Sequence, residues 1–317
     1  MRAISQDRFG EPDVLHLVDV PAPEPLPTEV LVRVVAAGVN PVDAKTRAGG
    51  GVAGVLGEPP FILGWDVSGV VEAVGHGVHT LAPGDDVYGM PWFPRQAGAY
   101  ADYVTAPSRQ FARKPATLDH DQAAAVPLAG LTAWQMLTAA LTIEPGQRVL
   151  IHAAGGGVGH FAVQIAKHLG AHVIGTARTA KHGWLRRLGA DELIDYTAEP
   201  FDKAIGEVGI DVVIDLTMDD QVGLRSLETL RPDGVQLAVP GGVSPALAAR
   251  AAELGVRVEP FLVEPDGPAL GEMAALFDTG VLSVEVESVF PLEKAADAHR
   301  HIATDRTQGK LVLHVAD

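Results

Sequence analysis

The sequence predicts an α/β protein in which a doubly wound parallel sheet is inserted into a mainly β domain. Up to about residue 111, short β-prone runs such as 29–36 (EVLVRVVA) are separated by glycine and proline. After about residue 119, helical stretches alternate with solid apolar runs, which is typical of parallel strands covered on both faces. From about residue 258 the chain returns to β-like runs, so both ends of the chain are expected to belong to the β domain.

The periodicity of apolar residues predicts the individual elements. Helices are expected at 119–140, 159–169 and 180–188, and strands at 148–152, 172–175, 192–195, 211–216 and 235–239. Near the end, strands at 284–290 and 310–315 are expected to flank a helix at 291–303. The segment 21–27 (PAPEPLP) is rich in proline and is expected to be an extended connector. The domains are therefore expected at 1–120 together with 259–317, and at 121–258.

Composition excludes several classes of function. The 317 residues are 47% hydrophobic and 20% charged, which is enough to bury the cores of two domains. The net charge of -16 disfavours a nucleic-acid partner, because such binding depends on Lys and Arg neutralising phosphates. The absence of cysteine excludes disulfides, thiolate nucleophiles and zinc sites built on sulfur. Neither a signal peptide nor an apolar run of about 20 residues is visible, so a cytoplasmic protein without a membrane partner is expected.

Residues 148–159 (RVLIHAAGGGVG) carry the strongest functional signal. A buried strand ends in a glycine-rich turn that opens into the amphipathic stretch HFAVQIAKHLG. Glycines let the backbone approach a pyrophosphate, and the following helix offers unpaired N–H groups and the positive end of its dipole. A glycine triplet alone usually marks a flexible loop, but the strand before it and the helix and second strand after it predict a dinucleotide site.

The residues after the second strand predict which dinucleotide binds. An enzyme that uses NAD usually carries Asp or Glu at this position, where the carboxylate accepts from the ribose 2′-hydroxyl. Here the strand runs into Thr176, Ala177 and Arg178, and Lys181 follows. Arg178 and Lys181 would make charge-assisted bonds with a 2′-phosphate, so NADPH is favoured over NADH. The alternative is that both are solvated cations at the start of a helix.

Recognisable stretches follow one another along nearly the whole chain. They are GVNPVDAKTRAG (38–49), GWDVSGVVEAVG (64–75), GDDVYG (84–89), GAYADYV (98–104), AAAVPLAGLTAWQ (123–135), HAAGGGVGHFAVQIAK (152–167), LGADELIDY (188–196), FPLEKAADAHR (290–300) and QGKLVLHV (308–315). Together they resemble the zinc-independent quinone oxidoreductase (zeta-crystallin-like) branch of the medium-chain dehydrogenase/reductase superfamily. The resemblance implies a GroES-like β-barrel domain made from both ends of the chain, a Rossmann domain between them, and a homodimer.

The resemblance also bears on metal binding. Zinc-containing relatives carry Cys at the position of Asn40, His at the position of Trp65 and a four-cysteine lobe, and all of these are absent here. No metal is therefore expected, which disfavours an alcohol dehydrogenase, because a simple ketone is hard to polarise without a Lewis acid. Hydride can still pass from NADPH to an electron-poor conjugated acceptor, a quinone or an α,β-unsaturated carbonyl, in which charge develops on a remote oxygen.

The segment 40–45 (NPVDAK) is placed by the resemblance at the nicotinamide end of the site. Asn40 is expected to contact the cofactor or the substrate carbonyl, and Lys45 to stabilise an enolate or to donate a proton. The alternatives are a turn residue before proline and a surface lysine. Asp43 is expected to be structural, holding the loop or pairing with Lys45 or Arg47.

Further cofactor contacts are carried over from the family by matching motifs. They are Thr132 in LTAW, Gly156, Gly157 and Val158 in the turn, Tyr196 after LID, and Leu216, Val239, Pro240 and Gly241 at the ends of later strands. Two departures are visible, since relatives often carry Gly-Gly at Thr217 and Met218 and Arg at Gln308. The first could narrow the nicotinamide pocket, and the second could remove a salt bridge.

The leading hypothesis is an NADPH-dependent reductase of quinones or activated alkenes. An enoyl-thioester reductase is one alternative, and Lys45 in place of the usual Tyr donor argues mildly against it. A non-catalytic, NADPH-binding redox sensor, which retains the dinucleotide site without turnover, is the other.

Overall fold

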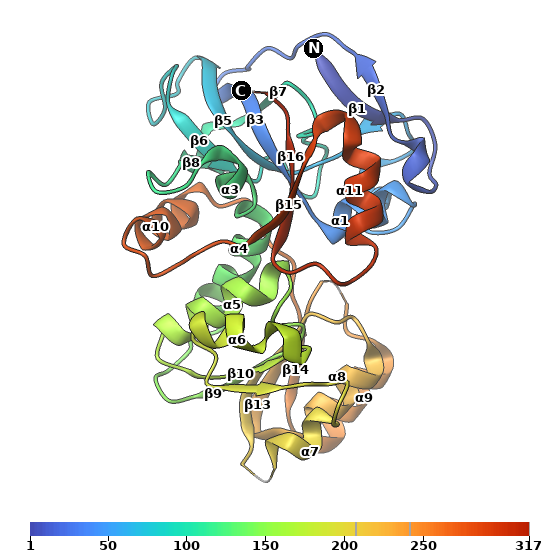
Figure 1. Ribbon diagram of the computed structural model, residues 1–317, viewed down its shortest axis with the longest axis vertical. Coiled ribbons are helices and arrows are strands. Elements are labelled where there is room, and N and C mark those ends of the chain that lie inside the picture. The colour runs from blue at the N-terminus through green and yellow to red at the C-terminus, as the bar shows by residue number, and fades with distance from the viewer. Residues whose placement is uncertain (207, 241, 317) are drawn as a thin grey trace. The chain divides into compact units, whose positions relative to one another are not determined.

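The computed structural model describes residues 1–206, 208–240 and 242–316 (Figure 1). The chain divides into two compact units, of which one contains Met1–Leu131 and the chain from Glu264 onward, and the other contains Thr132–Val263. The domain boundaries expected at 120/121 and 258/259 stay a prediction, because a division by spatial contacts does not test which parts fold on their own. No helix in the described part of the chain is long and apolar enough to cross a membrane.

The first unit is built on a seven-stranded sheet to which both ends of the chain contribute. Its strands run in the order β15, β16, β3, β5, β6, β8, and β7 also pairs with β3, while a second sheet has the order β2, β1, β4. Every neighbouring pair is antiparallel except β15 and β16. The strands are β1 (Arg2–Gln6), β2 (His16–Asp19), β3 (Glu29–Val39), β4 (Phe61–Ile62), β5 (Asp66–Val74), β6 (Asp86–Gly89), β7 (Tyr103–Pro107), β8 (Phe111–Arg113), β15 (Val286–Pro291) and β16 (Lys310–His314).

Strand β16 brings the end of the chain to the loop that follows β3. Leu311 pairs with Val39 in antiparallel register. Lys310 therefore lies beside the end of β3, next to Asn40, although 270 residues separate the two in sequence. This pairing places a basic side chain at the start of the predicted nicotinamide segment.

Proline decides where several helices of this unit begin. Helix α1 (Pro41–Arg47) has proline in its first turn, and the Asp43 carboxylate accepts from the backbone N–H of Asn40 at 2.7 Å. The single helix expected at 119–140 is wrong. Pro127 has no N–H to donate and restricts the residue before it, so one helix ends and another begins there. The other helices of this unit are α2 (Ala53–Leu56), α3 (His120–Ala124), α10 (Gly267–Asp278) and α11 (Ala295–Ile302). Helix α4 (Pro127–Gln135) begins in this unit, and its end and the π-helical turn that follows (Met136–Ala140) belong to the second unit.

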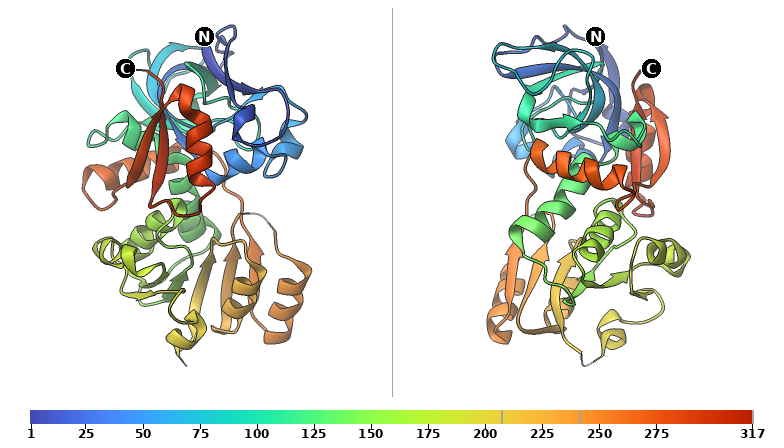
Figure 2. Two further views of the ribbon diagram at one scale, coloured as in Figure 1. Left: turned by 45° about the vertical axis from the view of Figure 1, so that its right-hand side comes forward. Right: turned by 90° about the vertical axis from the view of Figure 1, so that its left-hand side faces the viewer.

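The second unit is a six-stranded parallel sheet flanked by helices (Figure 2). The strand order is β11, β10, β9, β12, β13, β14, so the winding direction reverses between β9 and β12. In such a doubly wound sheet, ligands bind outside the carboxyl ends of the strands near the reversal. The predicted fold class is confirmed. The elements are β9 (Arg148–Ile151), α5 (Gly157–His168), β10 (His172–Thr176), α6 (Thr179–Arg187), β11 (Glu192–Ile194), α7 (Phe201–Ile205), β12 (Ile210–Asp215), α8 (Asp220–Leu227), β13 (Leu230–Ala238), α9 (Pro245–Leu254) and β14 (Arg257–Pro260).

Two elements differ from the sequence-based expectation. Strand β14 pairs with β13 in the parallel sheet, whereas the sequence predicts a return to the β domain from about residue 258. Its sequence, RVEP, lacks a solid apolar run because an edge strand is paired on one side only and is partly exposed. Helix α10 follows within the first unit, and its start is capped by the Asp266 carboxylate, which accepts from Ala269 N at 3.0 Å.

Candidate functional site

The glycine-rich turn joins the end of β9 to the start of α5. Gly156 is the N-cap of α5, and Gly157 and Val158 form its first turn. At Gly159 a Cβ atom would lie 2.7 Å from Ala154 Cα, so only glycine lets the helix pack this closely on the turn. The N–H groups at the helix start have no partners within the helix and can bind an anion.

Lys181 lies over this turn. Its Nζ donates to the carbonyl oxygen of Gly155 at 3.0 Å, and a Cβ atom at Gly155 would lie 2.6 Å from Lys181 Cδ. Glycine at position 155 therefore makes room for the stem of the lysine. The ammonium group and the start of α5 together place positive charge where the sequence predicts a phosphate.

Arg178 and Tyr196 lie side by side at the ends of the neighbouring strands β10 and β11. Arg178 Nε donates to Tyr196 Oη at 3.3 Å, and both side chains are exposed. Thr176 and Ala177, which precede Arg178, are buried. The structure thus brings two predicted cofactor residues together, with the cation reachable from solvent.

His152 belongs to the same end of the sheet, and sequence reasoning found no role for it. Its Nδ1 lies 3.1 Å from Thr176 Oγ1 and its Nε2 lies 2.9 Å from Ser226 Oγ. Burial lowers the pKa of His152 to about 3, so the imidazole is neutral. It ties the end of β9 to β10 and α8. No sequence signal reveals this, because Ser226 is 74 residues away.

A small cavity of about 90 Å³ lies at the carboxyl ends of β12 and β13. Two of the predicted cofactor residues, Val239 and Pro240, line it. Leu216 follows β12 directly, and the next residue, Thr217, donates from N and Oγ1 to Asp215 Oδ1 at 3.0 and 2.7 Å. The predicted contact Gly241 lies outside the described residues. Thr132 is buried on α4, and its role as a cofactor contact stays a prediction.

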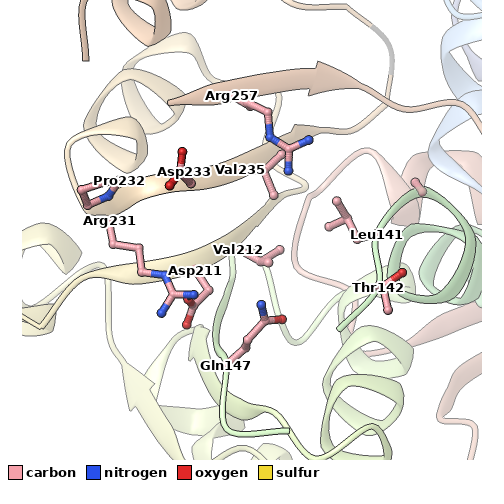
Figure 3. A pocket seen from close by; sticks show the side chains of 11 residues that line it. Leu141, Thr142, Gln147, Asp211, Val212, Arg231, Pro232, Asp233, Val235 and Arg257 are labelled. Carbon is pink, nitrogen blue, oxygen red and sulfur yellow. The ribbon is translucent and has the colours of Figure 1, made fainter. Parts of the chain in front are cut away.

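A larger cavity, of about 420 Å³, lies at the amino ends of the strands of the same sheet (Figure 3). Gln147, Asp211, Arg231 and Arg257 line it, and they stand at the amino ends of β9, β12, β13 and β14. Arg231 forms an ion pair with Asp211 there. Dinucleotides bind at the carboxyl ends of parallel strands, so this cavity is not part of the candidate cofactor site.

In the first unit, Asn40 lies inside a buried polar cluster. Its Nδ2 donates to Asp66 Oδ2 at 2.8 Å, and its Oδ1 accepts from Lys310 Nζ. Lys310 Nζ also donates to Val39 O at 3.1 Å and lies 3.6 Å from Asp66 Oδ2. Asn40 is only 1% exposed and its amide is bonded on both sides, which fits the alternative of a turn residue before Pro41. Its contact with the cofactor or the substrate carbonyl stays a prediction.

Asp43 and Tyr100 extend this cluster. Tyr100 Oη donates to Asp43 Oδ2 at 2.9 Å and lies 3.3 Å from His299 Nε2. Burial raises the pKa of Asp43 to about 7 and lowers the pKa of Lys310. The structural role expected for Asp43 fits this geometry. Of the two forms expected for that role, holding the loop matches the bonds observed, because the carboxylate accepts from the backbone N–H of Asn40 and from Tyr100.

Lys45 lies on α1 and is half-buried. Desolvation lowers its pKa, and the negative charge of Asp305 acts in the opposite direction. An ammonium group with a lowered pKa releases its proton more readily than a surface lysine does. This environment suits the proton-donor role predicted from the sequence, which stays a prediction.

The residues at the zinc positions of relatives are packed or hydrogen-bonded within the protein. Trp65 is buried, donates from Nε1 to Arg95 O at 2.6 Å and packs edge-on against Phe93. Asn40 is bonded as described above. Over the ranges 1–206, 208–240 and 242–316, no group of three or more His, Cys, Asp or Glu side chains is arranged to hold a metal ion.

Comparison with known proteins gives consistent matches over the chain. The family model of the alcohol dehydrogenase GroES-like domain matches residues 26–116, and that of zinc-binding dehydrogenases matches residues 188–313. A 2-haloacrylate reductase of a Burkholderia species is 36% identical, and the match covers 96% of each chain.

Two solved structures extend the comparison. The quinone oxidoreductase from Coxiella burnetii is 39% identical, with a TM-score of 0.94 over 99% of each chain. The Escherichia coli quinone oxidoreductase complexed with NADPH is 29% identical, with a TM-score of 0.88, and the match covers 99% of this chain and 100% of that one. These matches confirm the GroES-like domain and the Rossmann-like sheet predicted from the sequence.

Proposed function

The chain belongs to the quinone oxidoreductase branch of the medium-chain dehydrogenase/reductase superfamily, and from this premise we propose that it reduces conjugated acceptors with NADPH. It is an oxidoreductase, as its relatives are. The proposed acceptor is a quinone or an activated alkene such as an α,β-unsaturated carbonyl, and the proposed transfer needs no metal.

The observation that carries the proposal is the pair of cations beside the glycine-rich turn. Lys181 reaches over Gly155, and Arg178 is exposed at the end of β10. A 2′-phosphate gains charge-assisted hydrogen bonds from both side chains, whereas the 2′-hydroxyl of NADH does not. The turn itself fits a pyrophosphate, because a side chain at Gly159 would collide with the backbone that forms the cradle. The relative that is complexed with NADPH supports this choice of cofactor.

The reduction needs a hydride and a proton. When bound, NADPH supplies the hydride, which enters a carbon conjugated to a carbonyl, so that negative charge develops on the carbonyl oxygen. The half-buried Lys45 is proposed to stabilise that oxygen and to donate the proton, because desolvation already lowers its pKa. Lys45 would thus balance the negative charge that develops on the acceptor.

The buried cluster around Asn40 supports a metal-free reaction. The Asn40 side chain is bonded to Asp66 and to Lys310, so its oxygen already accepts from an ammonium group. With Trp65 packed at the second zinc position, the chain supplies no ligand set for a catalytic zinc ion at these positions. An acceptor that needs no Lewis acid follows from this.

NADPH oxidation tests the proposal. The loss of nicotinamide absorbance is followed with ortho- and para-quinones, enals, enones, 2-haloacrylates and enoyl thioesters. Turnover of quinones or enones is the expected result. Turnover of enoyl thioesters alone would favour the enoyl-thioester reductase. If NADPH binds and no acceptor is reduced, a redox sensor would replace the enzyme.

The expected homodimer and cytoplasmic location are part of the proposal. Both rest on similarity to the family rather than on a feature of the described residues. Sedimentation analysis of the purified protein tests the first, and imaging of the tagged full chain in its host tests the second.

A further inference from the structure

We propose that Asp195 is a positioning residue that sets the preference for NADPH over NADH by holding Arg178 and Tyr196 in place. The inference rests on the proposed function, in which Arg178 and Lys181 meet the 2′-phosphate, and Tyr196 accepts a hydrogen bond from Arg178 Nε at 3.3 Å. Asp195 is the first residue after β11, at the carboxyl end of the sheet. Asp195 acts through its neighbours, because its carboxylate bonds to Thr179 and Thr197.

The Asp195 carboxylate accepts four hydrogen bonds from two segments. Its Oδ2 accepts from Thr179 N at 2.8 Å and from the Thr179 hydroxyl. Its Oδ1 accepts from Thr197 N at 2.9 Å and from Thr197 Oγ1 at 2.6 Å. Thr179 directly follows Arg178, and Thr197 directly follows Tyr196. One carboxylate therefore fixes the backbone next to Arg178 and next to its hydrogen-bond partner Tyr196.

This clamp also fixes the start of α6. Arg178 is the N-cap of α6, and its own side chain makes no capping bond. Asp195 supplies the missing acceptor through Thr179 N, which is an otherwise unpaired donor of the first turn. Lys181 lies in the same turn, with its N–H bonded to Arg178 O at 2.9 Å. The position of both cations thus depends on the bond between α6 and the end of β11.

The negative charge of Asp195 opposes binding of the 2′-phosphate, whereas its hydrogen bonds favour that binding by holding Arg178 in place. A carboxylate near this end of the sheet repels a 2′-phosphate by simple electrostatics, as in enzymes that prefer NAD. Hydrogen bonds from Thr179 and Thr197 hold the pKa of Asp195 well below its usual range, so the group stays ionised in the working pH range. Removal of the Asp195 side chain should therefore weaken NADPH binding if positioning dominates and tighten it if charge dominates.

The test is the substitution Asp195→Ala, with binding of NADPH and NADH measured by titration calorimetry. Loss of the clamp should weaken NADPH by about five- to tenfold, comparable to the loss of a helix cap, and leave NADH nearly unchanged. Adenosine 2′,5′-bisphosphate and 5′-AMP should repeat this difference, since they isolate the 2′-phosphate. Tighter or unchanged binding of NADPH would overturn the proposal.

Two further variants separate positioning from general effects. Asp191→Ala is the matched control, because Asp191 also links β11 to β10, by accepting from Val173 N at 2.9 Å, but at the amino end of the strand. Asp191→Ala removes one negative charge, as Asp195→Ala does, and should leave the ratio of the NADPH and NADH affinities unchanged. Asp195→Asn loses the charge but keeps one acceptor oxygen, so its NADPH affinity should fall between wild type and Asp195→Ala.

Failure of the proposed function and failure of the positioning role of Asp195 give different results. A wild-type protein that binds neither NADPH nor adenosine 2′,5′-bisphosphate would refute the proposed function. A wild-type protein that binds NADPH, with Asp195→Asn and Asp195→Ala equally tight or tighter, would refute only the positioning role. If Asp195→Ala does not fold, as judged by circular dichroism, Asp195→Asn decides the question.

Discussion

Replacing Lys310 by methionine should lower the free energy of unfolding by about 3–5 kcal/mol. The Lys310 ammonium is buried, lies 3.6 Å from Asp66 and bonds to Val39 O and Asn40 Oδ1. Methionine fills a similar volume but carries no charge. The substitution therefore leaves Asp66 buried without its cation, and removal of one partner from a buried pair costs more than the pair itself contributes.

The loss of stability caused by Lys310→Met should depend on pH. Burial already raises the pKa of Asp66 above its usual value of 3.8, and the charge of Lys310 opposes this shift. Without Lys310, Asp66 keeps a proton in the folded state that it loses above about pH 4 in the unfolded chain. Stability of Lys310→Met should therefore fall as pH rises, by up to about 1.4 kcal/mol per pH unit, until the pKa in the folded state is passed. The deficit relative to wild type is expected to be larger at pH 7.5 than at pH 5.

Urea denaturation followed by circular dichroism measures both effects. Lys294→Met is the matched control, because Lys294 is 63% exposed in a surface pair with Asp297, and its loss should cost less than about 1 kcal/mol. Adding Asp66→Asn to Lys310→Met should recover part of the loss, since the uncompensated charge is removed. A loss of stability for Lys310→Met no larger than that of Lys294→Met, or one independent of pH, would show that Lys310 does not compensate a buried charge on Asp66.

Three further predictions concern the proposed site and the cluster. Lys45→Ala should lower kcat by about tenfold or more with NADPH affinity nearly unchanged, while Lys45→Arg keeps the charge. Equal turnover of Lys45→Ala and wild type would show that Lys45 is a surface lysine with no part in the reaction. Arg178→Ala with Lys181→Ala should weaken NADPH at least about tenfold more than NADH, as calorimetry can measure. Asp43, whose pKa burial raises from 3.8 to about 7, keeps a proton that the unfolded chain loses. Wild-type stability should thus fall between about pH 4 and 7, and Asp43→Asn should flatten that slope in urea titrations.

The strand, glycine-rich turn and helix at the proposed phosphate site could be predicted from the sequence because their determinants are contiguous. Strand, glycines and helix all fall within residues 148–168, and Gly159 meets a local requirement for the absence of a side chain, because a Cβ atom there would collide with the backbone of Ala154. The cations Arg178 and Lys181 follow at a fixed distance, since they begin the helix after the next strand. In this region the order of the chain is also the order in space, so spacing alone suffices.

The cluster around Asn40 could not be predicted in the same way. Asp66 is 26 residues from Asn40, and Lys310 is 270 residues away on the last strand. Only the pairing of β16 with β3 brings them together. The sequence marks each as a single polar residue in an apolar stretch, which gives no information on its partner. The same holds for Asp195, whose bonds reach back across a helix start to Thr179.

The identity of residue 40 follows from its two neighbours. Asn40 lies between a cation and an anion, Lys310 on one side and Asp66 on the other. An amide suits this place because its oxygen accepts from the ammonium group while its nitrogen donates to the carboxylate. A carboxylate at position 40 would satisfy Lys310 and repel Asp66, and an apolar side chain would leave both buried charges short of a partner. The same two bonds hold the Asn40 amide within the buried cluster.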